Sequence, residues 1–173
     1  MGNLAAPQSL IARWQELCRD PSLEDLPYKI ELNTWGKVEM SPASVQHGWL
    51  QAALAAALAQ HLPEGITLTE CPIVTDIGVR VPDVAWASSA FMKQHHGISP
   101  LPCAPELCAE IISPSNVEAE ISAKIHAYLA AGTHEVWLVA ENGTVRFFDR
   151  SGEIRESRFG IAVRLPDLTK GYP

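Results

Sequence analysis

Apolar residues recur every three or four positions in three segments of the chain, which is the spacing of one face of a helix. These segments predict helices over residues 8–19, 41–61 and 117–131. The second helix is expected to begin with Ser41 as its N-cap and Pro42 in its first turn, and to end near His61. His47 lies on the apolar stripe of this helix, so its imidazole should point toward the core or toward a cavity that the helix covers.

Runs of β-branched and other apolar residues predict strands between and after the helices. The first two runs flank a turn at residues 33–36 and the last two flank Asn142-Gly143, so each pair should form a hairpin. Residues 91–105 read as a loop. The predicted strands are 28–32, 37–40, 66–74 with a break at Cys71-Pro72, 79–81, 83–87, 107–112, 135–139 and 144–148.

The strand predicted over residues 107–112 is a nearly continuous apolar run that contains one carboxylate, Glu110. Such a run is typical of a central strand buried on both faces. Acidic side chains are rarely buried without a partner, so Glu110 is the exception in this pattern. The turn at residues 113–116 and the helix that follows it complete a βα unit.

Length and composition favour a single domain. The chain has 173 residues, of which 47% are apolar, so it can bury one sizeable core. No repeat and no Gly/Ser-rich or charged linker interrupts its middle. We therefore expect one domain over residues 1–173, with its core at about residues 28–165.

The sequence shows no export signal, and its longest apolar stretch, residues 50–58, has about half the length of a bilayer span. The cysteines form no C-x-x-C pair, and their irregular spacing fits reduced thiols better than a disulfide framework or a structural zinc site. We therefore expect a cytoplasmic protein with no membrane partner. The cysteines are Cys18, Cys71, Cys103 and Cys108.

The charge of the chain weighs against a protein that grips nucleic acid through phosphate neutralisation alone. Thirteen basic and twenty acidic residues give a formal net charge of -7, which has the wrong sign for that role. A metal-dependent site, however, gathers carboxylates, and its bound cations reverse the local field. The overall charge therefore still allows a metal-dependent enzyme that acts on phosphates.

Asp83 and Glu110 are candidates for a metal site. Asp83 opens the strand predicted after Pro82, and Glu110 lies in the next strongly apolar strand, so neighbouring strands can bring the two carboxylates together. Hard oxygen donors of this kind suit Mg²⁺ or Mn²⁺. The structural alternative is that Asp83 caps a turn and that Glu110 binds a backbone group or an arginine.

Lys124 is the candidate cation for this site. On a helical wheel it flanks the apolar face that includes Tyr128, so it does not lie on the solvent face. The alternative is a lysine that packs its aliphatic stem and extends its charge to water. Glu39 and His47 are possible accessory residues, as a further ligand or a proton shuttle, although Glu39 can equally be a solvated residue and His47 a core histidine.

Four ordered blocks of sequence, spanning residues 35–139, resemble the putative restriction endonuclease family of the PD-(D/E)XK nuclease superfamily. The resemblance implies an α/β fold of the restriction-endonuclease type, a mixed sheet flanked by helices. It also implies that Pro82-Asp83 is the PD element and that Glu110 is the second acidic metal ligand. The blocks are G-K-V-E-M-S-P-A-S-V-Q-H-G, V-P-D-V-A-W-A, P-E-L-C-A-E-I-I-S-P-S and K-I-H-A-Y-L-A-A-G-T-H-E-V-W-L-V.

The chain departs from the superfamily pattern at Ile112, where a lysine is usual two residues after the acid. The resemblance implies that Lys124, which matches the helix lysine of the family's K-x-x-x-Y pattern, supplies the charge instead. The function it implies is a Mg²⁺- or Mn²⁺-dependent endonuclease that hydrolyses phosphodiester bonds of DNA and acts as a homodimer. The alternative is a catalytically inactive module that keeps the nuclease fold and serves as a binding or assembly unit.

Overall fold

The computed structural model describes residues 6–24, 26, 28–42, 44–114 and 116–170. Its helices are α1 (Pro7–Leu17), α2 (Val45–His61), α3 (Ser89–Gln94) and α4 (Glu118–Ala130), with short 3-10 turns at Pro21–Leu23 and Leu168–Lys170. Its strands are β1 (Tyr28–Leu32), β2 (Val38–Pro42), β3 (Gly65–Thr69), β4 (Ile73–Thr75), β5 (Gly78–Arg80), β6 (Val84–Ser88), β7 (Leu107–Ile112), β8 (Glu135–Ala140), β9 (Val145–Asp149) and β10 (Gly152–Ile154).

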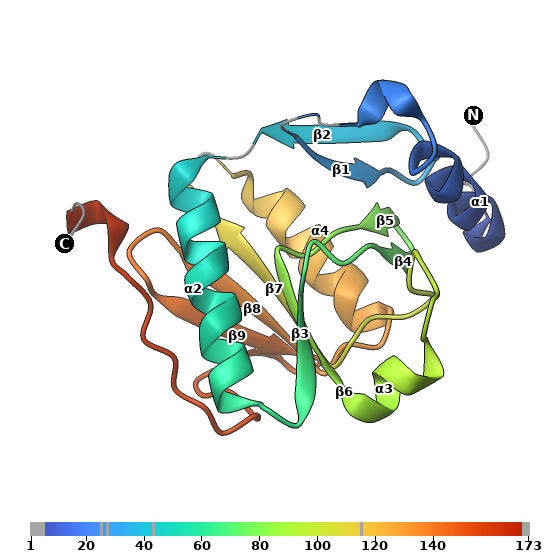
Figure 1. The fold of residues 1–173 in the computed structure, drawn as a ribbon. Helices are drawn as coiled ribbons and strands as arrows, with labels where there is room; N and C mark the ends of the chain where they lie inside the picture. Colours follow the sequence, from blue (N-terminus) through green and yellow to red (C-terminus); the bar gives the residue numbers. More distant parts are fainter. Residues whose placement is uncertain (1–5, 25, 27, 43, 115, 171–173) are drawn as a thin grey trace.

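A six-stranded mixed sheet in the order β10-β9-β8-β7-β6-β3 forms the centre of the fold. Only β7 and β8 run parallel, as the βα unit through α4 requires, and the other neighbours are antiparallel. Helix α2 covers one face of this sheet and α4 covers the other (Figure 1). The fold is therefore the mixed sheet flanked by helices that the family resemblance implied.

The alternation of β7 between its two faces decides where Glu110 points. Ala109 and Ile111 pack in the core that contains the leucines of α2. Cys108 packs in the second core, with Tyr128 and other residues of α4. Because successive strand residues face opposite sides, Glu110 lies on the α4 side of the sheet.

A smaller sheet, in the order β2-β1-β5-β4, lies beside the first one together with α1 (Figure 1). Leu32 of β1 is fully buried in an apolar cluster with residues of α1, β4 and β5. Gly78, at the start of β5, has φ of +120°, and a Cβ there would lie 2.0 Å from the Leu32 carbonyl oxygen. Glycine therefore permits the close approach that holds the β1–β2 hairpin in place.

The structure corrects three details of the predicted elements. Ser41 and Pro42 end strand β2 and do not start α2, whose N-cap is Ser44, a side chain that accepts a hydrogen bond from the His47 N–H. Part of the predicted loop at 91–105 belongs to α3. Asp83 precedes β6, which begins at Val84.

The other predicted helices and strands lie close to their predicted positions, and the short strand β10 was not predicted. The N-cap of α4 is Val117, which makes no side-chain cap, and Asn116 instead closes the preceding turn by accepting from the Ser113 N–H at 2.7 Å. Ser115 of that turn and residues 1–5 lie outside the described residues. In the part of the chain that the structure describes, no helix has both the length and the apolar character needed to cross a bilayer.

Candidate active site

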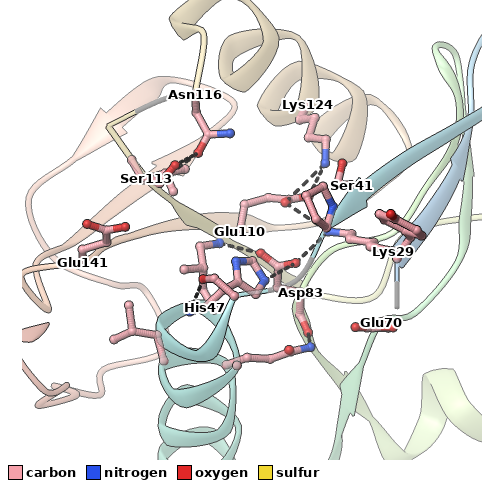
Figure 2. A pocket seen from close by; sticks show the side chains of 18 of the residues that line it. Lys29, Ser41, His47, Glu70, Asp83, Glu110, Ser113, Asn116, Lys124 and Glu141 are labelled. Atoms are coloured by element: carbon pink, nitrogen blue, oxygen red, sulfur yellow. Dashed lines mark hydrogen bonds and ion pairs between the residues drawn. The ribbon is translucent and has the colours of Figure 1, made fainter. Parts of the chain in front are cut away.

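Five elements meet around a cavity of about 620 Å³ at the carboxyl end of β7. They are β1, the first turns of α2, the residue before β6, β7 itself, and α4. Their side chains Lys29, His47, Asp83, Glu110 and Lys124 point toward one another (Figure 2). The structure thus brings together four of the five residues that the sequence singled out, and adds Lys29 to them.

The side chain of Asp83 is 1% exposed and is held on both sides. Its Oδ2 atom accepts a hydrogen bond from the backbone N–H of Ile111 at 2.7 Å. Its Oδ1 atom accepts from the Lys29 ammonium at 2.6 Å and lies 3.2 Å from His47 Nε2. The Gln51 side chain of α2 binds the Asp83 carbonyl oxygen at 2.9 Å.

Glu110 faces α4, and its carboxylate contacts two residues of that helix. Its Oε1 atom accepts from the Tyr128 hydroxyl at 2.6 Å and lies 3.2 Å from Lys124 Nζ. Its Oε2 atom lies 3.4 Å from Lys124 Nζ and 3.5 Å from Lys29 Nζ. The helix therefore supplies both a cation and a neutral donor to one carboxylate.

Glu31 of β1 extends this network away from the cavity. Its Oε1 atom accepts from Lys124 Nζ at 3.1 Å and from the Val81 N–H at 2.8 Å. Arg80 binds Glu31 at 3.2 Å and Glu39 at 2.6 Å. Glu39 is thus linked to the site through Arg80 and Glu31, and among the described residues it makes no direct ion pair with a lysine of the site.

Burial and charge together set the protonation states in this network. Burial by itself raises the pKa of Asp83, but the hydrogen bond with His47 and the charge of Lys29 outweigh it and hold this pKa well below its usual range. Burial lowers the pKa of Lys29, but Glu110 and Asp83 raise it by more, so the net shift is upward. Burial and the charge of Glu110 raise the pKa of Tyr128, so its hydroxyl remains a donor. The hydrogen bond to Asp83 raises the pKa of His47.

Lys29 and Glu31 are the site residues that the sequence prediction missed. They stand two positions apart in β1, and so share one face of a strand whose placement depends on contacts distant in sequence. A lysine and a glutamate on one face of a short strand resemble an ordinary solvated face. No local signal in the sequence separates Lys29 and Glu31 from such a face, because the full burial of the adjacent Leu32 is seen only in the structure.

The donor chemistry of the site fits a divalent metal ion. Asp83 and Glu110 offer carboxylate oxygens, which Mg²⁺ and Mn²⁺ prefer, and the Lys29 ammonium lies between them as a stand-in cation. Among the described residues, no group of three or more His, Cys, Asp or Glu side chains is placed so that it could hold a metal ion by itself. Mg²⁺ is commonly held by one or two carboxylates together with waters and substrate phosphates, and two carboxylates beside an open cavity match that arrangement.

Comparisons with known proteins identify the family of the chain and a solved structure with a similar fold. Residues 14–171 match the family model described as "Uma2: Putative restriction endonuclease". Among solved structures, the fold is similar to that of a putative nuclease belonging to DUF820 from Anabaena variabilis ATCC 29413, with a TM-score of 0.66 and 18% sequence identity. That match covers 88% of this chain and 93% of the other. No curated protein matches the chain.

Proposed function

Because the chain belongs to the Uma2 family of putative restriction endonucleases, we propose that it is a metal-dependent endonuclease that hydrolyses phosphodiester bonds of DNA. Family membership supports the nuclease role. The observation that carries the proposal is the pairing of two buried carboxylates, Asp83 and Glu110, with lysines from separate elements beside one cavity. Burying several charges together is costly and is typical of a functional site.

In this proposal Asp83 and Glu110 hold Mg²⁺ or Mn²⁺. When bound, the ion supplies Lewis-acid polarisation of the phosphate and a lower pKa for water. Lys124, fixed between Glu110 and Glu31, orients the attacking water or stabilises charge that develops on the phosphate. His47, at the cavity wall beside Asp83, is placed to carry a proton away from the site.

Glu39 has a supporting role in this proposal. Its carboxylate binds Arg80, Arg80 binds Glu31, and Glu31 binds Lys124. Glu39 therefore acts on the cavity by positioning other charges. We also propose that the enzyme acts as a homodimer, because paired sites allow both strands of a duplex to be cut.

A second candidate function is a binding or assembly module that retains the nuclease fold without activity. The observation in its favour is that the acidic groups already have cationic or N–H partners within the protein, in a chain of net charge -7. A site that needs no metal for charge balance can serve stability alone.

Isosteric variants test the proposed function. Asp83→Asn and Glu110→Gln keep the size of each side chain and one acceptor oxygen, whereas alanine would remove both oxygens and leave a space beside Lys29 or Lys124. Each variant should lose Mn²⁺ binding in isothermal titration calorimetry and plasmid cleavage in Mg²⁺ or Mn²⁺, because each lacks a metal ligand. The matched control is Asp76→Asn, which neutralises an exposed aspartate in the β4–β5 turn. Unchanged Mn²⁺ affinity and cleavage in both site variants would show that the carboxylates are structural.

A further inference from the structure

Lys29 occupies the gap between the two candidate metal ligands. Its ammonium lies 2.6 Å from Asp83 Oδ1 and 3.5 Å from Glu110 Oε2, and its side chain is 13% exposed. Figure 2 shows its contacts reaching both carboxylates from the β1 side of the cavity. We propose that Lys29 is the resident cation of this site, and that a divalent ion binds only when the Lys29 ammonium leaves the gap. The inference rests on the proposed metal-binding function and concerns how that binding is controlled.

The partners of the other carboxylate oxygens explain why the ion has to compete with Lys29. Asp83 Oδ2 accepts from the Ile111 N–H, a backbone group that cannot move aside without disturbing β7. Glu110 Oε1 accepts from the buried Tyr128 hydroxyl. The oxygens that Lys29 contacts, Asp83 Oδ1 and Glu110 Oε2, are the pair that a metal ion between the two side chains would share.

An ammonium group and a divalent ion cannot occupy this gap together. Mg²⁺ binds ligand oxygens at about 2.0–2.1 Å, a space that the Lys29 nitrogen already fills on the Asp83 side. Their like charges also repel, and repulsion between partly buried charges is only weakly screened by salt. The two carboxylates can therefore bind either the Lys29 ammonium or the divalent ion, but not both at once.

The cavity beside the gap can accept the Lys29 side chain when its ammonium moves away from the two carboxylates. Its side chain lines the 620 Å³ cavity, which is also lined by polar groups of Ser41, Ser44 and Asn116. A lysine ammonium on a flexible four-carbon stem can swing into such a space while its backbone stays in β1. There the charge would face the phosphate of a bound substrate, so loading of the metal and positioning of the phosphate would be coupled.

Calorimetric titration with Mn²⁺ in the absence of nucleic acid tests this inference. The proteins compared are the parent, Lys29→Met, Lys29→Gln and Lys37→Met, where Lys37 is an exposed lysine of the same hairpin. A positive charge close to a carboxylate commonly lowers the pKa of that carboxylate by about one to three units, and the same repulsion weakens the binding of a divalent cation. Both Lys29 variants should therefore bind Mn²⁺ at least about tenfold more tightly than the parent, and Lys37→Met should match the parent. Lys29→Gln keeps a neutral donor for both carboxylates, so the test does not depend on tolerance of methionine.

Two controls locate the effect at the site. Adding Asp83→Asn to Lys29→Gln should abolish the gain in affinity, and Mn²⁺ should raise the melting temperature of Lys29→Gln by more than that of the parent. If the parent binds Mn²⁺ and the Lys29 variants bind it no more tightly, the inference is overturned and the proposed function stands. If the variants bind and the parent does not, the inference is supported and the parent's metal-dependent activity is contradicted. If none of the proteins binds Mn²⁺, both fail.

Discussion

At the scale of single residues, the candidate site is a chain of charges that alternate in sign. From Glu39 it passes through Arg80, Glu31, Lys124 and Glu110, and it continues through Lys29 to Asp83 and His47. Loss of Lys124 leaves Glu31 with Arg80 and Glu110 with Lys29, and loss of Lys29 leaves Glu110 with Lys124 and Asp83 with His47. This redundancy makes it possible to change single residues without losing the fold.

Lys124→Met tests whether the charge of Lys124, and not its aliphatic stem, serves the reaction. Glu110 keeps Lys29 and Tyr128, and Glu31 keeps Arg80 and Val81, so the variant should fold. Plasmid cleavage should fall by at least about a hundredfold, the scale of losing one donor to the transition state. Mn²⁺ should bind at least as tightly as to the parent, because a competing cation has been removed.

The control for Lys124→Met is Lys93→Met, which changes an exposed lysine of α3 and should cleave like the parent. Ile112 lines the same cavity as Lys124 and occupies the position where the superfamily usually has lysine. Adding Ile112→Lys to Lys124→Met should therefore restore part of the cleavage. Equal cleavage by the parent and Lys124→Met would mean that Lys124 only forms structural ion pairs with Glu110 and Glu31 and takes no part in the reaction.

A site residue could be predicted from the sequence where a charged side chain interrupts a local apolar pattern. Glu110 interrupts an apolar strand, and Lys124 flanks an apolar helix face, so both stand out in sequence. Lys29 and Glu31 do not stand out, because an alternating short strand can carry charges on a solvated face. Their burial follows from packing of Leu32 against α1, β4 and β5. The sequence shows the charges, but only this non-local packing brings them to the cavity.

At the scale of elements, the junction between β2 and α2 shows the limit of local signals. Ser41-Pro42 has the form of a helix start, but Pro42 pairs with Tyr28 at the end of an edge strand, where the missing N–H of proline costs little. Ser44 caps the helix instead, through its hydroxyl and the His47 N–H at 3.1 Å. A helix that begins after Ser44 also places the side chains of His47 and Gln51 next to Asp83.

Two serine variants distinguish Ser44 from Ser41 as the N-cap of α2. Ser44→Ala removes the cap of α2 and should lower the free energy of unfolding by about 1 kcal/mol. Ser41→Ala changes an exposed position of β2 and should have an effect within about 0.5 kcal/mol of zero. Urea unfolding followed by circular dichroism measures both. A larger loss in Ser41→Ala than in Ser44→Ala would restore Ser41 as the helix cap.

At the scale of the whole molecule, net charge and local charge give different information. The formal charge of -7 belongs to the whole chain, whereas the acids of the candidate site are matched by Lys29, Lys124 and Arg80. A protein of this charge gains little from general attraction to a polyanion. In the proposed function, binding of a duplex therefore depends on the site itself and on how many copies of the site engage the duplex at once.

The proposed homodimer is consistent with this dependence. Two copies related by a two-fold axis would present two sites to the two strands of a duplex, and this is the commonest closed symmetry of protein assemblies. Multi-angle light scattering at micromolar concentration should give a mass of twice 18.8 kDa. Supercoiled plasmid should become linear without a long-lived nicked form.

A mixed assembly separates this prediction from simple aggregation. When the parent is co-expressed with a Glu110→Gln chain that carries a different affinity tag, dimers that contain one chain of each kind can be purified. Each mixed dimer has one intact pair of metal ligands, so it should nick one strand and leave the other uncut. A monomeric mass would contradict the homodimer. Linear product from the mixed dimer at the parent's rate would show that one site cuts both strands in turn, and that pairing of the chains serves another purpose.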